Sequence, residues 1–199
     1  MKKRLLSLFC ALALCLSLLP GTAWAAEEWT YSSGTPAKIS DGETTLTVTR
    51  SNQNLTITGV STLASLGVLV LPTEAKNVDG GDTYTVIDIG AGAFMDCSGL
   101  TSVTVPDRIT IDSTAFANCT NLTSATLPSD LTAIPQSLFA GCTSLTDIAL
   151  PEKITSIGNY AFQNCTSLTS ITVPSGVTSI GSDAFMAAPR SNASSCRKA

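Results

Sequence analysis

Four cysteines recur along the chain at an almost constant spacing of 22, 23 and 23 residues, at Cys97, Cys119, Cys142 and Cys165. Such thiols can form disulfides in an oxidising compartment, bind zinc as thiolates, or stay protonated as small buried hydrophobes. A disulfide requires Cα atoms within about 7 Å and suitable side-chain directions. One cysteine per repeated unit therefore favours free, buried thiols, with disulfides and a zinc site as the alternatives.

Residues that usually perform catalysis are missing or lack a recognisable arrangement. The chain has no histidine, which removes the commonest general base and the imidazole metal ligands. It contains no Gly-x-Ser-x-Gly elbow, phosphate-binding glycine loop or His-Glu-x-x-His motif. Asp79 and Asp82 supply fewer oxygen ligands than a calcium site needs. We therefore expect a protein that is not an enzyme and that has no cofactor and no metal site.

The cysteines belong to a longer repeated unit, and such a repeat determines the fold. The unit reads Ile-x-x-x-Ala/Leu-Phe-x-x-Cys-x-x-Leu-x-x-φ-x-φ-Pro, where φ is an aliphatic residue. One interval is shorter by a residue, because four residues separate Pro106 from Ile111 where five separate Pro128 from Ile134. The phenylalanine position of the unit is expected to form a continuous buried column, which includes Phe116, Phe139 and Phe162.

Each unit divides into two halves with different periodicity. The pattern Leu168-x-x-Ile171-x-Val173-Pro174 alternates, which indicates a half-buried strand, and the proline ends its hydrogen-bond ladder. Residues 157–168 place apolar side chains at nearly helical spacing, which predicts a short helical turn. The predicted fold is an α/β repeat solenoid over residues 66–186, with one short parallel strand and one short helical turn per unit of 22–23 residues.

This unit resembles the BspA-like class of leucine-rich repeats. The resemblance rests on the string Ile-Gly-x-x-Ala-Phe-x-x-Cys-Thr-Ser-Leu-Thr-Ser-Ile-Thr-Val-Pro at residues 157–174 and covers roughly Leu66 to Phe185. It implies a secreted or surface-attached protein of a host-associated bacterium. Some proteins of this class are adhesins for host matrix proteins, so the resemblance implies a binding function that the periodicity alone does not establish.

The first 25 residues have the features of a secretory signal peptide. Lys2, Lys3 and Arg4 precede an apolar run over residues 5–19, and Ala23-Trp24-Ala25 offers small residues for cleavage after Ala25. A retained membrane anchor is the alternative, but the run is shorter than the roughly 18–20 apolar residues that favour a span. We expect a secreted, extracellular or surface-bound protein that does not insert into a membrane after cleavage.

Three further segments flank or interrupt the repeats. Residues 26–65 are predicted to form a polar segment and a β-hairpin cap, because Leu46-Thr-Val48 and Leu55-Thr-Ile57 alternate on either side of a polar turn. An 11-residue insertion between Pro72 and Val86 is expected to be an exposed loop. Residues 187–199 lack the strand pattern and are expected to be a divergent tail, disordered or truncated.

The charge balance limits the classes of partner. Apolar residues make up 44 % of the chain and charged residues 13 %. Loss of Lys2, Lys3 and Arg4 with the signal peptide reduces the basic residues from 11 to 8 against 15 acidic residues, which gives a net charge of −7. An acidic chain repels phosphate backbones and anionic membranes, so we expect no nucleic-acid partner.

A candidate binding face follows from the predicted strands. The third and fifth residues of each strand pattern should point away from the core, because side chains alternate across a strand. An acidic residue that follows one of the prolines flanks the same sheet. The candidate residues are Ser102, Thr104, Ser124, Thr126, Asp147, Ala149, Glu152, Ser170 and Thr172.

The expected partner of this face is a protein, with host extracellular matrix proteins as the class that the resemblance suggests. A carbohydrate partner is less favoured because the face offers no aromatic platform. The main alternative is a structural spacer or stalk of a longer surface protein, with no ligand site of its own. If the face does not bind, the Thr73–Thr85 loop is the next candidate.

Overall fold

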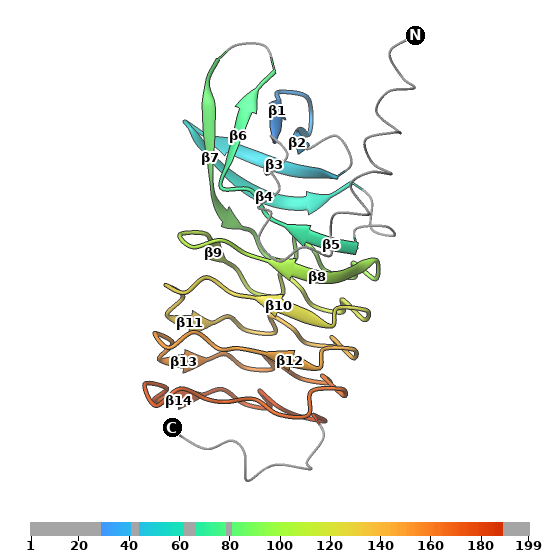
Figure 1. The fold of residues 1–199 in the computed structure, drawn as a ribbon, viewed down its shortest axis with the longest axis vertical. Helices are drawn as coiled ribbons and strands as arrows, with labels where there is room; N and C mark the ends of the chain where they lie inside the picture. Colours follow the sequence, from blue (N-terminus) through green and yellow to red (C-terminus); the bar gives the residue numbers. More distant parts are fainter. Residues whose placement is uncertain (1–28, 41–43, 62–66, 79–80, 189–199) are drawn as a thin grey trace, which may run out of the picture.

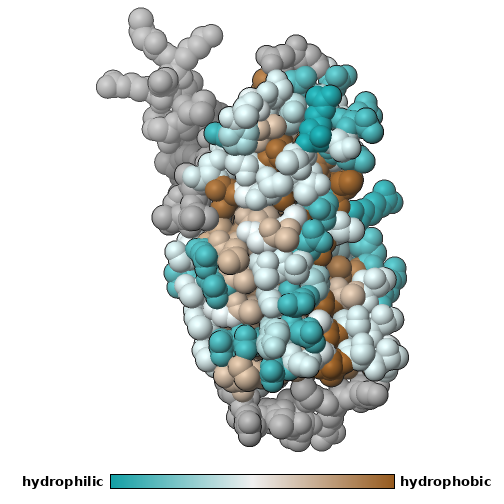
Figure 2. Space-filling view, turned by 180° about the vertical axis from the view of Figure 1, so that it is seen from behind, coloured by the Kyte–Doolittle hydropathy of each residue, from teal (hydrophilic) through white to brown (hydrophobic). Residues whose placement is uncertain are grey.

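The computed structural model describes residues 29–40, 44–61, 67–78 and 81–188, and within them it contains strands and turns but no helix. A group of N-terminal strands lies at one end of a stack of coils, and each coil is one sequence repeat (Figure 1). The predicted signal peptide and nearly all of the predicted tail lie outside the described residues. Polar side chains cover most of the face in Figure 2, where apolar side chains form a narrow band along the stack.

Six N-terminal strands pair in a closed ring. The pairs β1–β2, β2–β3, β3–β4 and β6–β7 are antiparallel, whereas β1–β6 and β4–β7 are parallel. The side chains of Tyr31 and Tyr84 are buried, with ring centroids 4.5 Å apart and ring planes tilted by 50°. Arg50 Nη1 donates a hydrogen bond of 3.0 Å to Tyr84 Oη. The strands are β1 (Thr30–Ser32), β2 (Ala37–Ser40), β3 (Thr45–Ser51), β4 (Asn54–Val60), β6 (Glu74–Asn77) and β7 (Thr83–Ile89).

Sequence patterns indicated only part of this ring. The predicted hairpin corresponds to β3 and β4. The segment before it holds β1 and β2, and the insertion expected to be an exposed loop instead forms β6 and the start of β7. These strands were missed because β1, β2 and β6 are three or four residues long, with a single buried residue each, at Tyr31, Ile39 and Ala75. So few residues give no measurable periodicity.

The strand half of the repeat forms a parallel sheet in the order β12-β10-β8-β5. Its strands are β5 (Gly67–Val70), β8 (Leu100–Thr104), β10 (Ser124–Thr126) and β12 (Asp147–Ile148). The parallel pairing and the direction of the side chains are as predicted. The strand expected over residues 168–174 is reduced to a single bridge residue, Val173. The ladder has already shortened from five residues in β8 to two in β12.

The other half of the repeat is not the predicted helical turn. It contains the short strands β9 (Thr110–Ile111), β11 (Ala133–Ile134), β13 (Ser156–Ile157) and β14 (Ser179–Ile180), followed by tight turns. In the second unit the amides of Thr114, Phe116 and Asn118 donate to carbonyls of the next coil at 3.0, 3.1 and 2.7 Å. Thr114 and Asn118 also have positive φ angles of 58° and 57°. A helix cannot form because the next coil takes the amides that it would need.

The second ladder is interrupted between two neighbouring coils. Strand β9 pairs with β7, and β11 pairs with β13, but no strand pairing among the described residues joins β9 to β11. In neighbouring coils the amides of Asp112, Gly158 and Gly181 each donate to the previous coil at 2.8 Å. Pro135 occupies the equivalent position and has no N–H to donate.

The core runs as a continuous column of aromatic rings through the coils. Phe94, Phe116, Phe139 and Phe162 are fully buried, and Phe185 continues the column as a partly buried residue. Successive rings are stacked, with centroids 5.3, 5.8, 5.7 and 5.4 Å apart. The predicted phenylalanine column is confirmed, and it fixes each coil directly above the next.

Candidate functional site

The cysteine column is structural. Cys97, Cys119, Cys142 and Cys165 are all free and buried, as the spacing favoured. The thiol of Cys119 donates to the carbonyl oxygen of Phe94 at 3.1 Å, and Cys142 and Cys165 make the same contact with the preceding coil. Burial raises the pKa of Cys97 to about 11 and that of Cys119 to about 12. At neutral pH these groups are protonated and poorly nucleophilic, because the thiolate is the reactive form.

The described part of the chain also gives no support for a metal site or a membrane-spanning helix. No group of three or more histidine, cysteine, aspartate or glutamate side chains is placed there to hold a metal ion. Nor does that part contain a helix long and apolar enough to cross a bilayer. Asp79 lies outside the described residues. The remaining candidate is the outward face of the β5-β8-β10-β12 sheet, here called the sheet face.

The sheet face carries two cross-strand rows of side chains. The strand register places four residues side by side in the first row: Val68, Ser102, Ser124 and Asp147. The second row contains Val70, Thr104 and Thr126. The serine and threonine of β8 are half-buried, and those of β10 are exposed. Ser124 Oγ donates to Ser102 Oγ at 3.0 Å, which links neighbouring coils within the first row.

A shallow hollow of about 260 Å³ lies at one end of the sheet face. Ile148, Leu150 and Ile171 line it, although their side chains are buried in the core. Five predicted face residues also line it, and of these only the first lies in a strand: Asp147, Ala149, Glu152, Ser170 and Thr172. The structure therefore brings together residues from two consecutive repeats. The other four predicted residues lie on β8 and β10, outside the hollow.

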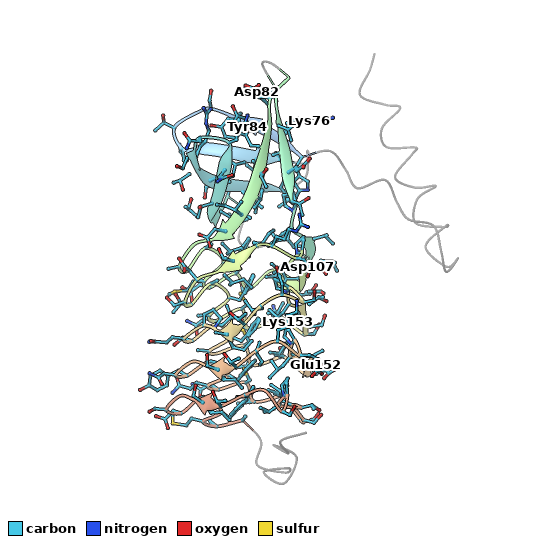
Figure 3. All side chains as sticks on the ribbon, turned by 90° about the vertical axis from the view of Figure 1, so that its left-hand side faces the viewer. Lys76, Asp82, Tyr84, Asp107, Glu152 and Lys153 are labelled. Atoms are coloured by element: carbon cyan, nitrogen blue, oxygen red, sulfur yellow. The ribbon has the colours of Figure 1, made fainter. Side chains whose placement is uncertain are left out.

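A polar edge borders the sheet face where the chain leaves each strand. Asp107 accepts hydrogen bonds from the amide and hydroxyl of Ser129, at 2.7 and 3.0 Å, and these bonds lower the pKa of its carboxyl group. Figure 3 shows Asp107, Lys153 and Glu152 on the same side of the stack. The edge thus presents charges of both signs, with the carboxylate of Asp107 held by the next coil.

Val68 and Val70 are part of the sheet face that sequence reasoning missed. Their side chains are 72 % and 59 % exposed, and they occupy the positions of the outward residues on β8. The alternation Leu66-x-x-Leu69-x-Leu71 contained the signal, because it placed both valines at outward positions. The face therefore begins with apolar side chains on β5 rather than with Ser102.

Solved structures with a similar fold are bacterial leucine-rich repeat proteins. A leucine-rich repeat protein from Bacteroides ovatus is 28 % identical with a TM-score of 0.63, over 82 % of this chain and 38 % of that protein. The T. pallidum leucine-rich repeat protein is 30 % identical with a TM-score of 0.60, over 71 % of this chain and 64 % of that protein. A Bacteroides capillosus leucine-rich repeat protein is 26 % identical with a TM-score of 0.54, over 67 % and 96 % of the two chains.

This chain therefore spans less than two thirds of the first two proteins. No curated protein sequence matches it significantly. The BspA type leucine-rich repeat region matches residues 82–191 in six copies, which is more than half of the chain. With the stacked repeat geometry and these structural relatives, that match shows that the chain belongs to the BspA-type leucine-rich repeat family.

Proposed function

We propose that this leucine-rich repeat solenoid is a protein-binding module that acts outside the cell or at its surface, and that the sheet face is its partner site. The observation that carries the proposal is the hollow at the end of the face, which joins outward residues of two repeats into one concave surface. Repeat proteins commonly use the extended surface of a stacked sheet for binding. Secretion is supported by the signal-peptide pattern of residues 1–25.

The nine residues proposed for this site share short or polar side chains. The face has no aromatic anchor of the kind that dominates tight interfaces, so one copy should bind weakly and gain strength through multivalency. The acidic chain disfavours nucleic acid. Extracellular matrix proteins are the first partner class to test. The proposed residues are Ser102, Thr104, Ser124, Thr126, Asp147, Ala149, Glu152, Ser170 and Thr172.

A charge-reversing variant tests the face directly. Asp147→Lys combined with Thr126→Arg changes two exposed side chains, so the variant should stay folded but lose binding to immobilised matrix proteins. The control is Asp112→Lys combined with Thr132→Arg, which makes the same charge change at exposed positions beside β9 and β11. Circular dichroism and thermal melting verify folding, and surface plasmon resonance measures binding.

The outcomes of this experiment separate the candidate functions. Loss of binding in the face variant alone supports the sheet face. Equal loss in both variants points to non-specific electrostatics. Full binding by the folded face variant moves the site elsewhere, with the β6–β7 hairpin as the next candidate. If the unmodified protein binds no matrix protein at all, a spacer or stalk accounts for the chain better.

A further inference from the structure

The first row of the sheet face has different chemistry at its two ends. At one end Val68 is 72 % exposed on β5, beside the exposed Val70. At the other end Asp147 borders the hollow together with Glu152. Within the described part of the chain, neither of these carboxylates takes part in a hydrogen bond or ion pair. One end therefore offers an apolar contact and the other offers free negative charge.

The middle of the row consists of small, uncharged side chains that hydrogen-bond to each other. Ser102 and Ser124 lie between the two ends in the register of the sheet and hydrogen-bond to each other. Ser102 is half-buried, so it does not stand above the sheet. A chain lying across the strands would meet no bulky side chain and no charge between the two ends.

The register sets the distance between the ends. Val68 and Asp147 are separated by three strand spacings in the order β5-β8-β10-β12. Neighbouring strands lie about 4.8 Å apart, so the two ends are about 14 Å apart. An extended polypeptide advances about 3.3 Å per residue and puts alternate side chains on one face, so residues about four apart match this distance and point the same way.

From this arrangement, and resting on the proposed function, we propose that the sheet face binds an extended segment of a partner polypeptide that runs across the strands. An apolar side chain of the segment packs on Val68 and Val70. A lysine or arginine about four residues away, in either direction, enters the hollow beside Asp147 and Glu152. The hollow suits a long basic side chain, because the exposed Ala149 beside the two carboxylates can contact the methylene stem.

Synthetic peptides test the proposed spacing. Fluorescent peptides of serine, threonine and glycine carry one leucine and one lysine, placed two, four or six residues apart so that both stay on one face. Anisotropy titrations with the full chain should show tightest binding at about four residues, because only this spacing reaches both ends of the row. Replacing the lysine by glutamate should abolish binding, and added salt should weaken it.

Two protein variants test how much each end of the row contributes to peptide binding. Val68→Ser with Val70→Ser should weaken the matched peptide about fivefold and leave its salt dependence intact. Asp147→Asn with Glu152→Gln should weaken it about fivefold and remove the salt dependence. The matched controls Val78→Ser and Asp112→Asn change exposed residues outside the row and should leave binding unchanged.

Equal affinity at all spacings, or full affinity in both row variants, overturns the row proposal. If spacing has no effect but Asp147→Lys with Thr126→Arg still loses matrix-protein binding, the sheet face stands as the partner site and the row proposal alone fails. If the peptides behave as expected but the face variant keeps matrix-protein binding, matrix proteins bind at another site, and the row proposal is supported for a different polypeptide partner.

Discussion

At the residue scale, stability depends on side chains that repeat in columns. Phe139 shows this arrangement: it is fully buried, and its ring lies between Phe116 and Phe162 at centroid distances of 5.8 and 5.7 Å. The neighbouring cysteine thiols donate to backbone carbonyls of the preceding coil, so each column also contributes hydrogen bonds between coils. A change at one position is therefore felt by the coils on both sides.

Phe139→Ala should lower the free energy of unfolding by about 3–5 kcal/mol, because it removes a buried aromatic ring and leaves a cavity between two others. Denaturant unfolding followed by circular dichroism measures this loss. Met95→Ala, at a residue 41 % exposed, is a suitable control and should have a small effect. An unchanged midpoint for Phe139→Ala would mean that the ring column does not stabilise the stack.

The buried thiols make the protein less stable at alkaline pH. Burial raises the pKa of Cys119 and Cys165 to about 12, whereas their ordinary value is 9.0. The folded pKa lies above the unfolded one, so the unfolded chain loses these protons first as pH rises. The free energy of unfolding should therefore fall between about pH 9 and about pH 12.

Denaturant midpoints at about pH 8 and about pH 10.5 test this effect, because the two values lie on either side of the ordinary thiol pKa. The parent protein should lose more stability over this interval than the variant Cys119→Ala with Cys165→Ala, which cannot ionise at these positions. An identical loss in both proteins would attribute the alkaline sensitivity to other groups.

At the scale of one coil, close backbone approach between neighbouring coils determines which residues are allowed. A Cβ atom added to Gly158 would lie 2.6 Å from the backbone nitrogen of Gln136 and 2.8 Å from its Cα. Real Cβ atoms do not approach backbone this closely, so the two coils would have to separate. By contrast, a Cβ on Gly176 would meet the carbonyl oxygen of Ile154 at 3.4 Å.

Gly158→Ala should therefore destabilise the protein by about 1–3 kcal/mol, the usual cost of overpacking, whereas Gly176→Ala should have a much smaller effect. Thermal and denaturant unfolding of the two single variants measure the difference. Equal stability of the two variants would show that the coils can move apart at little cost.

At the scale of the whole molecule, a closed ring of strands adjoins a stack whose coils contact mainly their neighbours. Strand β7 joins the two parts, because it pairs with β4 and β6 in the ring and with β9 in the first complete repeat. Stability should then depend on the number of correctly stacked interfaces between coils, as in other repeat arrays.

Deletion of residues 129–151 removes one complete repeat and joins Pro128 to Glu152, which restores the Pro151–Glu152 junction. The shortened protein should fold and unfold cooperatively with lower stability, because one interface between coils is lost. Deletion of residues 129–139 removes about half a repeat and should abolish cooperative unfolding, since strands would then face turns. Similar stability of the two deletions would contradict a register-dependent stack.

The sequence by itself determined the side-chain columns, the parallel pairing of the strand half of the repeat and the hairpin. These properties follow from which residues are buried, and burial at a regular interval is visible in a single chain. The family followed from the resemblance of the repeated unit to known repeats. The outward direction of Ser124, Thr126 and Asp147 followed from the same alternation.

Only the tertiary structure decided which backbone groups pair. The predicted helical turn became turns and short strands, because its amides donate to the next coil. The ring depends on pairing β1 with β6, two short strands far apart in the sequence. The hollow required Asp147 of one repeat and Ser170 of the next to lie on the same face of consecutive coils. Periodicity in a sequence reports burial, whereas hydrogen-bond partners and surface shape depend on contacts between distant segments.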